Sequence, residues 1–156
     1  MGRTAEIGNM AMKESIIRTK SYAFAVRIVR LFQWLSDTKK EYVLSKQLLR
    51  CGTSIGANVE EAGGAVSEKE FAAKIQIAFK EALETRFWLQ LLHDTDYLDS
   101  AAFDSLYADC GELVRILSSI TKSLREKYPS AHESFDPDAY GTPSPTPHSS
   151  FLIPHS

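Results

Sequence analysis

Apolar residues recur along most of the chain with the spacing of α-helices. Between residues 13 and 128 they fall largely at alternating steps of three and four, which places them on one helical face. All six prolines lie at or beyond position 129, so none interrupts this pattern. The pattern predicts four helices, at about 13–35, 41–62, 67–92 and 99–124.

These four apolar stripes also predict the core. Its expected members, in chain order, are Ile17, Phe24, Ile28, Leu31, Leu35, Leu44, Leu48, Cys51, Ile55, Val59, Phe71, Ile75, Ala78, Ala82, Thr85, Leu89, Leu92, Phe103, Leu106, Cys110, Leu113, Leu117, Ile120 and Leu124. Ser67 followed by Glu70 matches a capping box, Asp99 is a typical N-cap, and Gly63-Gly64 is a typical helix stop. Because short connections make successive helices antiparallel, we expect an all-α, up-down-up-down four-helix bundle.

The composition divides the chain into three parts. Residues 1–12 lack a clear apolar stripe and are expected to form a poorly ordered arm. The bundle is expected to span 13–128. Residues 129–156 are rich in proline and serine, a composition that cannot bury a core, and we expect a disordered tail.

The second predicted helix carries glycines and polar residues where a core helix would prefer leucine or alanine. Gly52 and Gly56 cost roughly 1 kcal/mol each relative to alanine, which suggests that another backbone comes close there. Ser54, Asn58 and Glu61 lie about one turn apart on this helix. Buried, they would form a hydrogen-bonded network that fixes helix register. Exposed, they would contact a ligand at a pore or ring face.

Apolar residues remain on the third predicted helix after its core stripe is complete. Because a bundle helix needs roughly three apolar positions in seven, the surplus predicts that another subunit covers part of this helix. The alternative is a wider core within one protomer. The surplus residues, which form the predicted oligomer interface, are Phe79, Leu83, Phe87, Trp88 and Leu91.

Charge is unevenly distributed along a chain whose net charge is −2. Residues 13–58 hold nine basic and three acidic side chains, and residues 59–97 hold four basic and eight acidic ones. Basic side chains on one helical face could hold the phosphates of RNA or DNA. Alternatively, the basic helices complement the acidic third helix within or between subunits. The candidate nucleic-acid-binding residues are Lys13, Lys20, Arg27, Arg30, Lys46 and Arg50.

Catalysis finds little support in the sequence. His93 lacks the glutamate three residues before it that carboxylate-bridged metal sites use, because Gln90 stands there. Four glutamates could in principle gather a metal, namely Glu60, Glu61, Glu81 and Glu84. We expect no cofactor, no metal and no enzymatic activity. Two isolated cysteines and the absence of a long apolar run favour a cytoplasmic protein that does not bind membranes.

The segments 41–62, 71–92 and 114–124 resemble the bacterial four-helix-bundle family encoded in intervening sequences of 23S rRNA genes. The residues that carry the resemblance are Arg50, Ser54, Ile55, Asn58, Glu61, Ala78, Glu81, Ala82 and Glu84. That family is similar in fold to the accessory variability protein of diversity-generating retroelements, a barrel-shaped homopentamer that binds a reverse transcriptase and nucleic acid. The resemblance implies a homopentamer with a central pore and no catalysis.

Two functions follow as expectations. The first is a non-catalytic ring that binds RNA or DNA, or serves as an accessory subunit of a reverse transcriptase. The second is a structural or regulatory oligomer that binds another protein and no nucleic acid, with its charge pairs serving assembly. A carboxylate-bridged metalloenzyme is a remote third.

Overall fold

The computed structural model describes residues 2–127, so the predicted tail at 129–156 lies outside the described part of the chain. The described residues form four α-helices and no strand, which confirms the all-α class. The helices are α1 (Gly2–Asp37), α2 (Leu44–Gly63), α3 (Glu68–Asp94) and α4 (Ser100–Lys127).

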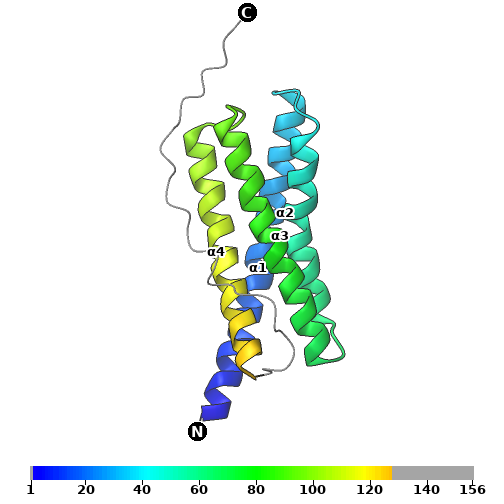
Figure 1. Cartoon of the computed structure of the whole chain (residues 1–156), viewed down its shortest axis with the longest axis vertical. Helices are drawn as coiled ribbons and strands as arrows, with labels where there is room; N and C mark the ends of the chain where they lie inside the picture. Colours follow the sequence, from blue (N-terminus) through cyan, green and yellow to red (C-terminus); the bar gives the residue numbers. More distant parts are fainter. Residues whose placement is uncertain (1, 128–156) are drawn as a thin grey trace, which may run out of the picture.

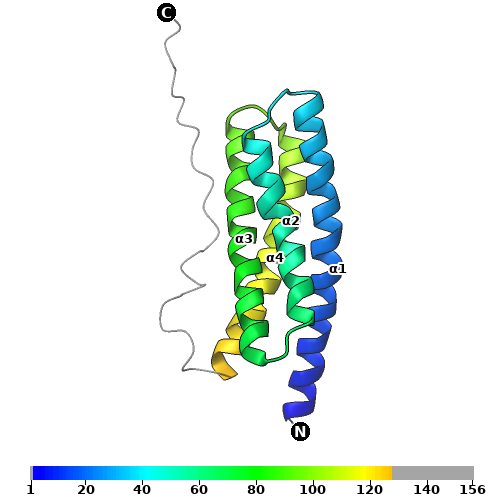
Figure 2. The ribbon, with the colours of Figure 1, turned by 90° about the vertical axis from the view of Figure 1, so that its right-hand side faces the viewer.

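The four helices lie side by side, and each packs mainly against two others. α1 contacts α2 and α4, and α3 contacts the same two helices. α1 and α3 therefore occupy opposite corners, and Figure 2 shows them at opposite edges of the molecule. In Figure 1 the α1–α2 and α3–α4 connections lie at one end of the molecule, which we call the two-turn end, and the α2–α3 connection lies at the other.

The core consists of the apolar stripes that the sequence predicted. Twenty of the twenty-four expected members are buried, which confirms the helical phase of all four segments. The remaining four, Leu44, Phe71, Phe103 and Leu124, are partly buried and pack against the same cluster. They lie near the helix ends, where neighbouring helices cover a side chain less completely.

The predicted start signals of α3 and α4 are confirmed. The Ser67 hydroxyl accepts a hydrogen bond from the Glu70 amide at 3.1 Å, and the Asp99 carboxylate accepts one from the Ala102 amide at 2.7 Å. α2 ends at Gly63, as predicted, but its C-cap residue Gly64 has φ −96° and needs no left-handed conformation.

The structure continues α1 through residues 2–12, where the sequence predicted an arm outside the bundle. No proline stands in residues 2–12, so nothing there forbids the helix, and Asn9, of a type that often caps helices, lies inside α1. Most of this first part of α1 is exposed, and Met10 packs against the core cluster. The apolar pattern predicted the residue at which α1 begins to pack on its neighbours, near Lys13, and not the residue at which the helix begins, Gly2.

α2 begins at Leu44 and not at position 41 as predicted, and Glu41 caps its start from three residues before it, which the sequence pattern did not predict. Its carboxylate accepts hydrogen bonds from the amides of Val43, Leu44 and Ser45, at 3.0, 2.8 and 2.7 Å. The side chain thus satisfies the free amides at the start of α2. Burial opposes ionisation of this carboxyl group, but the three amide hydrogen bonds outweigh burial and lower the pKa of Glu41 below its usual value.

Replacing Glu41 by alanine is expected to lower the free energy of unfolding by about 1–2 kcal/mol at neutral pH, because the amides lose their acceptor. Since the folded-state pKa is depressed, this stabilisation is present above the unfolded pKa of about 4.3 and is lost as pH falls through the folded value. Urea unfolding of wild type and Glu41→Ala from pH 7 to pH 3 should show the two stabilities converge. A difference that stays constant with pH would contradict the role of the charged form.

Candidate interaction site

α1 and α2 approach each other closely where α2 carries its two glycines. A β-carbon at Gly52 would lie 2.9 Å from Cγ1 and Cγ2 of Ile28, and one at Gly56 would lie 3.4 Å from the backbone oxygen of Ser21. Both glycines are buried against α1. Their lack of a side chain therefore sets the distance between these two helices.

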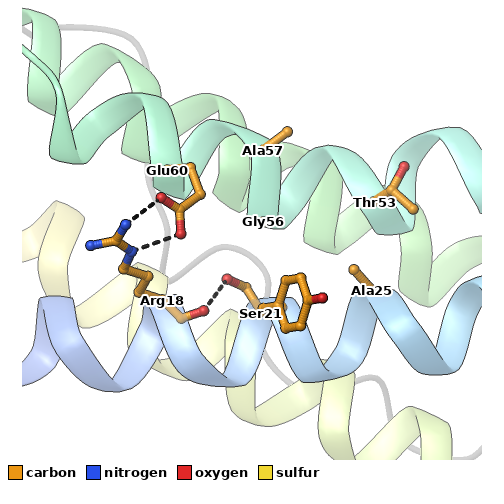
Figure 3. Close-up of a pocket in the computed structure, with 8 residues that line it drawn as sticks. Arg18, Ser21, Ala25, Thr53, Gly56, Ala57 and Glu60 are labelled. Atoms are coloured by element: carbon orange, nitrogen blue, oxygen red, sulfur yellow. Dashed lines mark hydrogen bonds and ion pairs between the residues drawn. The ribbon is translucent and has the colours of Figure 1, made fainter.

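A shallow groove of about 230 Å³ lies on the outer side of this helix pair. Small side chains from both helices line it, and Figure 3 shows Arg18 and Glu60 facing each other across one end. Their two hydrogen bonds, from Nε and Nη2 of Arg18, are both 2.7 Å long. The lining residues are Arg18, Ser21, Tyr22, Ala25, Thr53, Gly56, Ala57 and Glu60.

The polar residues of α2 bind chiefly within their own helix. The Ser54 hydroxyl donates to the Arg50 carbonyl at 2.7 Å, and the Asn58 side-chain amide donates to the Ser54 carbonyl at 2.9 Å. Both side chains are partly buried. Glu61 is exposed and forms an ion pair with Lys74 of α3.

Arg50 connects α2 to α3. Its guanidinium pairs with Glu84, and with Glu81 at 3.4 Å. The indole of Trp88 also donates to Glu84, at 3.1 Å. Burial raises the pKa of Glu81, whereas at Glu84 the hydrogen bonds from Trp88 and Arg50 outweigh burial and lower the pKa. The polar residues that carry the family resemblance thus gather along the α2–α3 side of the bundle.

Three basic side chains of α1 that were predicted to bind nucleic acid bind side chains of α4. Lys13, Lys20 and Arg27 lie on the face of α1 beside α4 and are engaged by α4 side chains. Their partners are, in order, the Ser119 hydroxyl at 2.8 Å, the Glu112 carboxylate at 3.0 Å, and the Asp109 carboxylate together with the Ser105 hydroxyl at 2.8 Å. Hydrogen bonds and ion pairs therefore link α1 to α4 along this boundary.

The two other predicted nucleic-acid-binding residues, Arg30 and Lys46, are exposed on α1 and α2. Lys39 and Lys40 lie nearby in sequence, in the α1–α2 turn, and the Lys39 ammonium sits 5.4 Å from the centre of the Trp34 ring. The α3–α4 connection, at the same end of the molecule, carries Asp94, Asp96 and Asp99. The α1–α2 side also holds Asp37 and Glu41, so the two-turn end is moderately basic on that side and acidic on the α3–α4 side.

Phe79 corrects the predicted oligomer interface. It is 1% exposed and belongs to the core of a single chain, because the bundle is wide enough to enclose a second apolar position in that turn of α3. Phe87 is 57% exposed and stacks edge-on against Trp88, with ring centres 5.0 Å apart. Leu83, Trp88 and Leu91 are partly buried.

The cysteines are poor candidates for chemistry. Burial raises the pKa of Cys51 to about 11 and that of Cys110 to about 12, so both thiols are protonated at neutral pH. Within residues 2–127 no three His, Cys, Asp or Glu side chains gather closely enough to hold a metal ion. Each of the four glutamates considered for a metal pairs instead with a basic residue.

Within the described residues, no helix combines the length and apolar character that crossing a membrane requires. The described residues define an all-α, four-helix protein with a shallow groove between α1 and α2 and exposed apolar side chains on α1 and α3. Residues 13–119 match the family described as 23S rRNA-intervening sequence protein, and the chain belongs to that family.

A solved structure supports this assignment. The chain is 47% identical to a crystallised protein of unknown function from the S23 ribosomal protein family of Bacteroides thetaiotaomicron, with a TM-score of 0.69. The similarity covers 70% of this chain and 98% of that one. A search of curated proteins found no match.

Sequence reasoning missed the opposed charges at the two-turn end and the Arg18–Glu60 pair. The acidic residues could have been noticed, because three aspartates occur within six positions, 94–99, at a predicted helix break. The Arg18–Glu60 pair left no such signal, since its members lie 42 positions apart and meet only once the helices pack.

Proposed function

We propose that this protein is a non-catalytic structural or regulatory component that works by assembling with copies of itself into a ring. Each protomer of the ring would be an antiparallel four-helix bundle. One observation carries the proposal: large apolar side chains stay exposed at opposite corners of a bundle whose core is already complete. Phe87 of α3 is 57% exposed, and Tyr22, Val26 and Val29 of α1 are exposed as well. The resemblance to a homopentameric relative favours five subunits.

The contacts of the predicted nucleic-acid-binding residues weaken the nucleic-acid alternative. Four of the six candidate residues, Lys13, Lys20, Arg27 and Arg50, are engaged by side chains of the same chain. A cation that already has an acidic or hydroxyl partner gains slightly less from a phosphate, because a weak surface bond must be exchanged. Binding of RNA, DNA or a reverse transcriptase stays a prediction of the resemblance.

Sedimentation of the purified full chain tests the proposal. Across micromolar dilutions we expect one species near five times the 17.4 kDa chain mass, because burial of the exposed apolar corners stabilises the assembly. A single 17.4 kDa particle at every concentration would refute assembly. Nucleic acid that sediments with the protein at low salt and leaves it steeply as salt rises would instead support the nucleic-acid role.

A further inference from the structure

The geometry points to a head-to-tail contact in which the outer face of α3 in one copy packs on the outer face of α1 in the next. This inference rests on the proposed function and names the two surfaces that would build the ring. The α3 patch consists of Ile77, Leu83, Phe87, Trp88 and Leu91. The α1 face consists of Tyr22, Val26 and Val29, and it borders the small-residue groove between α1 and α2.

Symmetry requires two different patches. A ring of more than two copies is built from one repeated heterologous contact, so every protomer must present two distinct and complementary surfaces. The two surfaces must also lie on different sides of the protomer, inclined so that each contact turns the next copy by a constant angle. α1 and α3 lie on different sides because they occupy opposite corners of the bundle, and Figure 2 shows them at its two edges.

The two surfaces lie at nearly the same level along the bundle. The residue before Val29 packs against Gly52 of α2. Glu84, three residues before Phe87, pairs with Arg50, two residues from Gly52. Val29 and Phe87 are therefore about one helical turn apart in height, or ~5 Å. Both surfaces extend over two turns or more, so they can meet without a rise from copy to copy. Together with a constant turn between copies, such a contact closes into a ring instead of growing as a filament.

Charge at the two-turn end favours the same contact. The acidic turn with Asp94 and Asp96 follows the α3 patch, and the turn that follows the α1 face carries Lys39 and Lys40 between Asp37 and Glu41. Both turns lie at one end of the molecule (Figure 1). A head-to-tail neighbour with parallel helices therefore brings the acidic turn beside Lys39 and Lys40, whereas a two-fold pairing of α3 patches with parallel helices would bring two acidic turns together.

Two variants that each destroy one surface test the inference. Phe87→Glu places a charge on the α3 patch and Val29→Glu places one on the α1 face, so each variant alone is expected to sediment as a 17.4 kDa monomer. Mixed together, the variants still hold one intact surface of each kind and should form a particle of two chains. Val66→Glu, at a 95% exposed position in the α2–α3 turn at the other end of the molecule, is the matched control and should keep the wild-type mass.

Monomers that fail to pair on mixing, or a Phe87→Glu protein of wild-type mass, would overturn the inference. Circular dichroism verifies that the variants stay helical. If either unfolds, a charge swap decides: Lys39→Glu with Lys40→Glu should weaken assembly at least tenfold, and adding Asp94→Lys with Asp96→Lys should restore it. A swap without effect, or without rescue, contradicts the contact. A monomeric wild type would refute the proposed function itself, whereas an oligomer indifferent to all these changes refutes this contact alone.

Discussion

Replacing Phe79 by alanine is expected to lower the free energy of unfolding by about 3–5 kcal/mol, the usual cost of removing a buried phenyl ring. Phe79 is among the largest fully buried side chains, at 1% exposure, and the bundle would be left with a cavity between α3 and its neighbours. Chemical unfolding followed by circular dichroism measures the loss. Because Phe79 makes its contacts within one chain, the loss should not change with protein concentration.

The concentration dependence separates a core residue from an interface residue. A residue that packs between copies stabilises the folded state more at high protein concentration, by mass action. Repeating the Phe79→Ala measurement over a hundredfold range of concentration therefore checks its assignment to the core. A loss of unfolding free energy that grows with protein concentration, or one below about 1 kcal/mol, would show that Phe79 packs between copies and not in the core.

The second large effect is expected at Gly52. A β-carbon there would lie 2.9 Å from two side-chain atoms of Ile28 and 3.3 Å from its Cβ, closer than atoms can pack without movement. Ile28 is fully buried and branched at Cβ, so it cannot simply rotate away. Overpacking of this kind costs about 1–3 kcal/mol, which exceeds the ~1 kcal/mol that alanine gains over glycine in a helix. Gly52→Ala should therefore destabilise the bundle.

Gly56→Ala is the matched control for this change. Gly56 lies one turn further along the same helix, and a β-carbon there would lie 3.4 Å from its nearest neighbour, the Ser21 carbonyl oxygen, which is the close limit of ordinary contact. The control should be neutral or slightly stabilising in thermal unfolding. The double variant Gly52→Ala with Ile28→Ala should be less destabilised than the sum of its two single changes, because the Ile28 atoms that collide with the new β-carbon are gone. Strict additivity would show that Gly52 is not in contact with Ile28.

Local pattern was sufficient to predict the helices and their core. The heptad spacing placed residues such as Leu48, Leu89 and Leu117 in the interior, and all three are fully buried. The start of α3 at Ser67 was equally predictable, because its hydroxyl and the Glu70 amide are three residues apart and meet in any helix. These features depend on near neighbours in sequence, which the pattern records directly.

Features that depend on the packing between helices were not predictable in the same way. Phe79 and Phe87 are eight positions apart on one helix and looked alike in sequence, yet one is buried and the other exposed. Eight positions turn a helix by about 80°, so Phe79 lies beside the core stripe of Ile75 and Ala82 and Phe87 lies on the outer face, a difference that is lost when both are assigned to one interface. Lys13, Lys20 and Arg27 formed a regular basic stripe, but their partners on α4 lie at least 78 positions away.

Cys51 and Cys110 are both fully buried, and their burial should protect the protein from oxidants. These are the two cysteines of the sequence, and both are enclosed by the bundle. Peroxide attacks the thiolate, which neither residue forms at physiological pH, and access would require the helices to separate first. The folded protein should therefore endure oxidising conditions without sulfenic acid formation or cross-linking through sulfur.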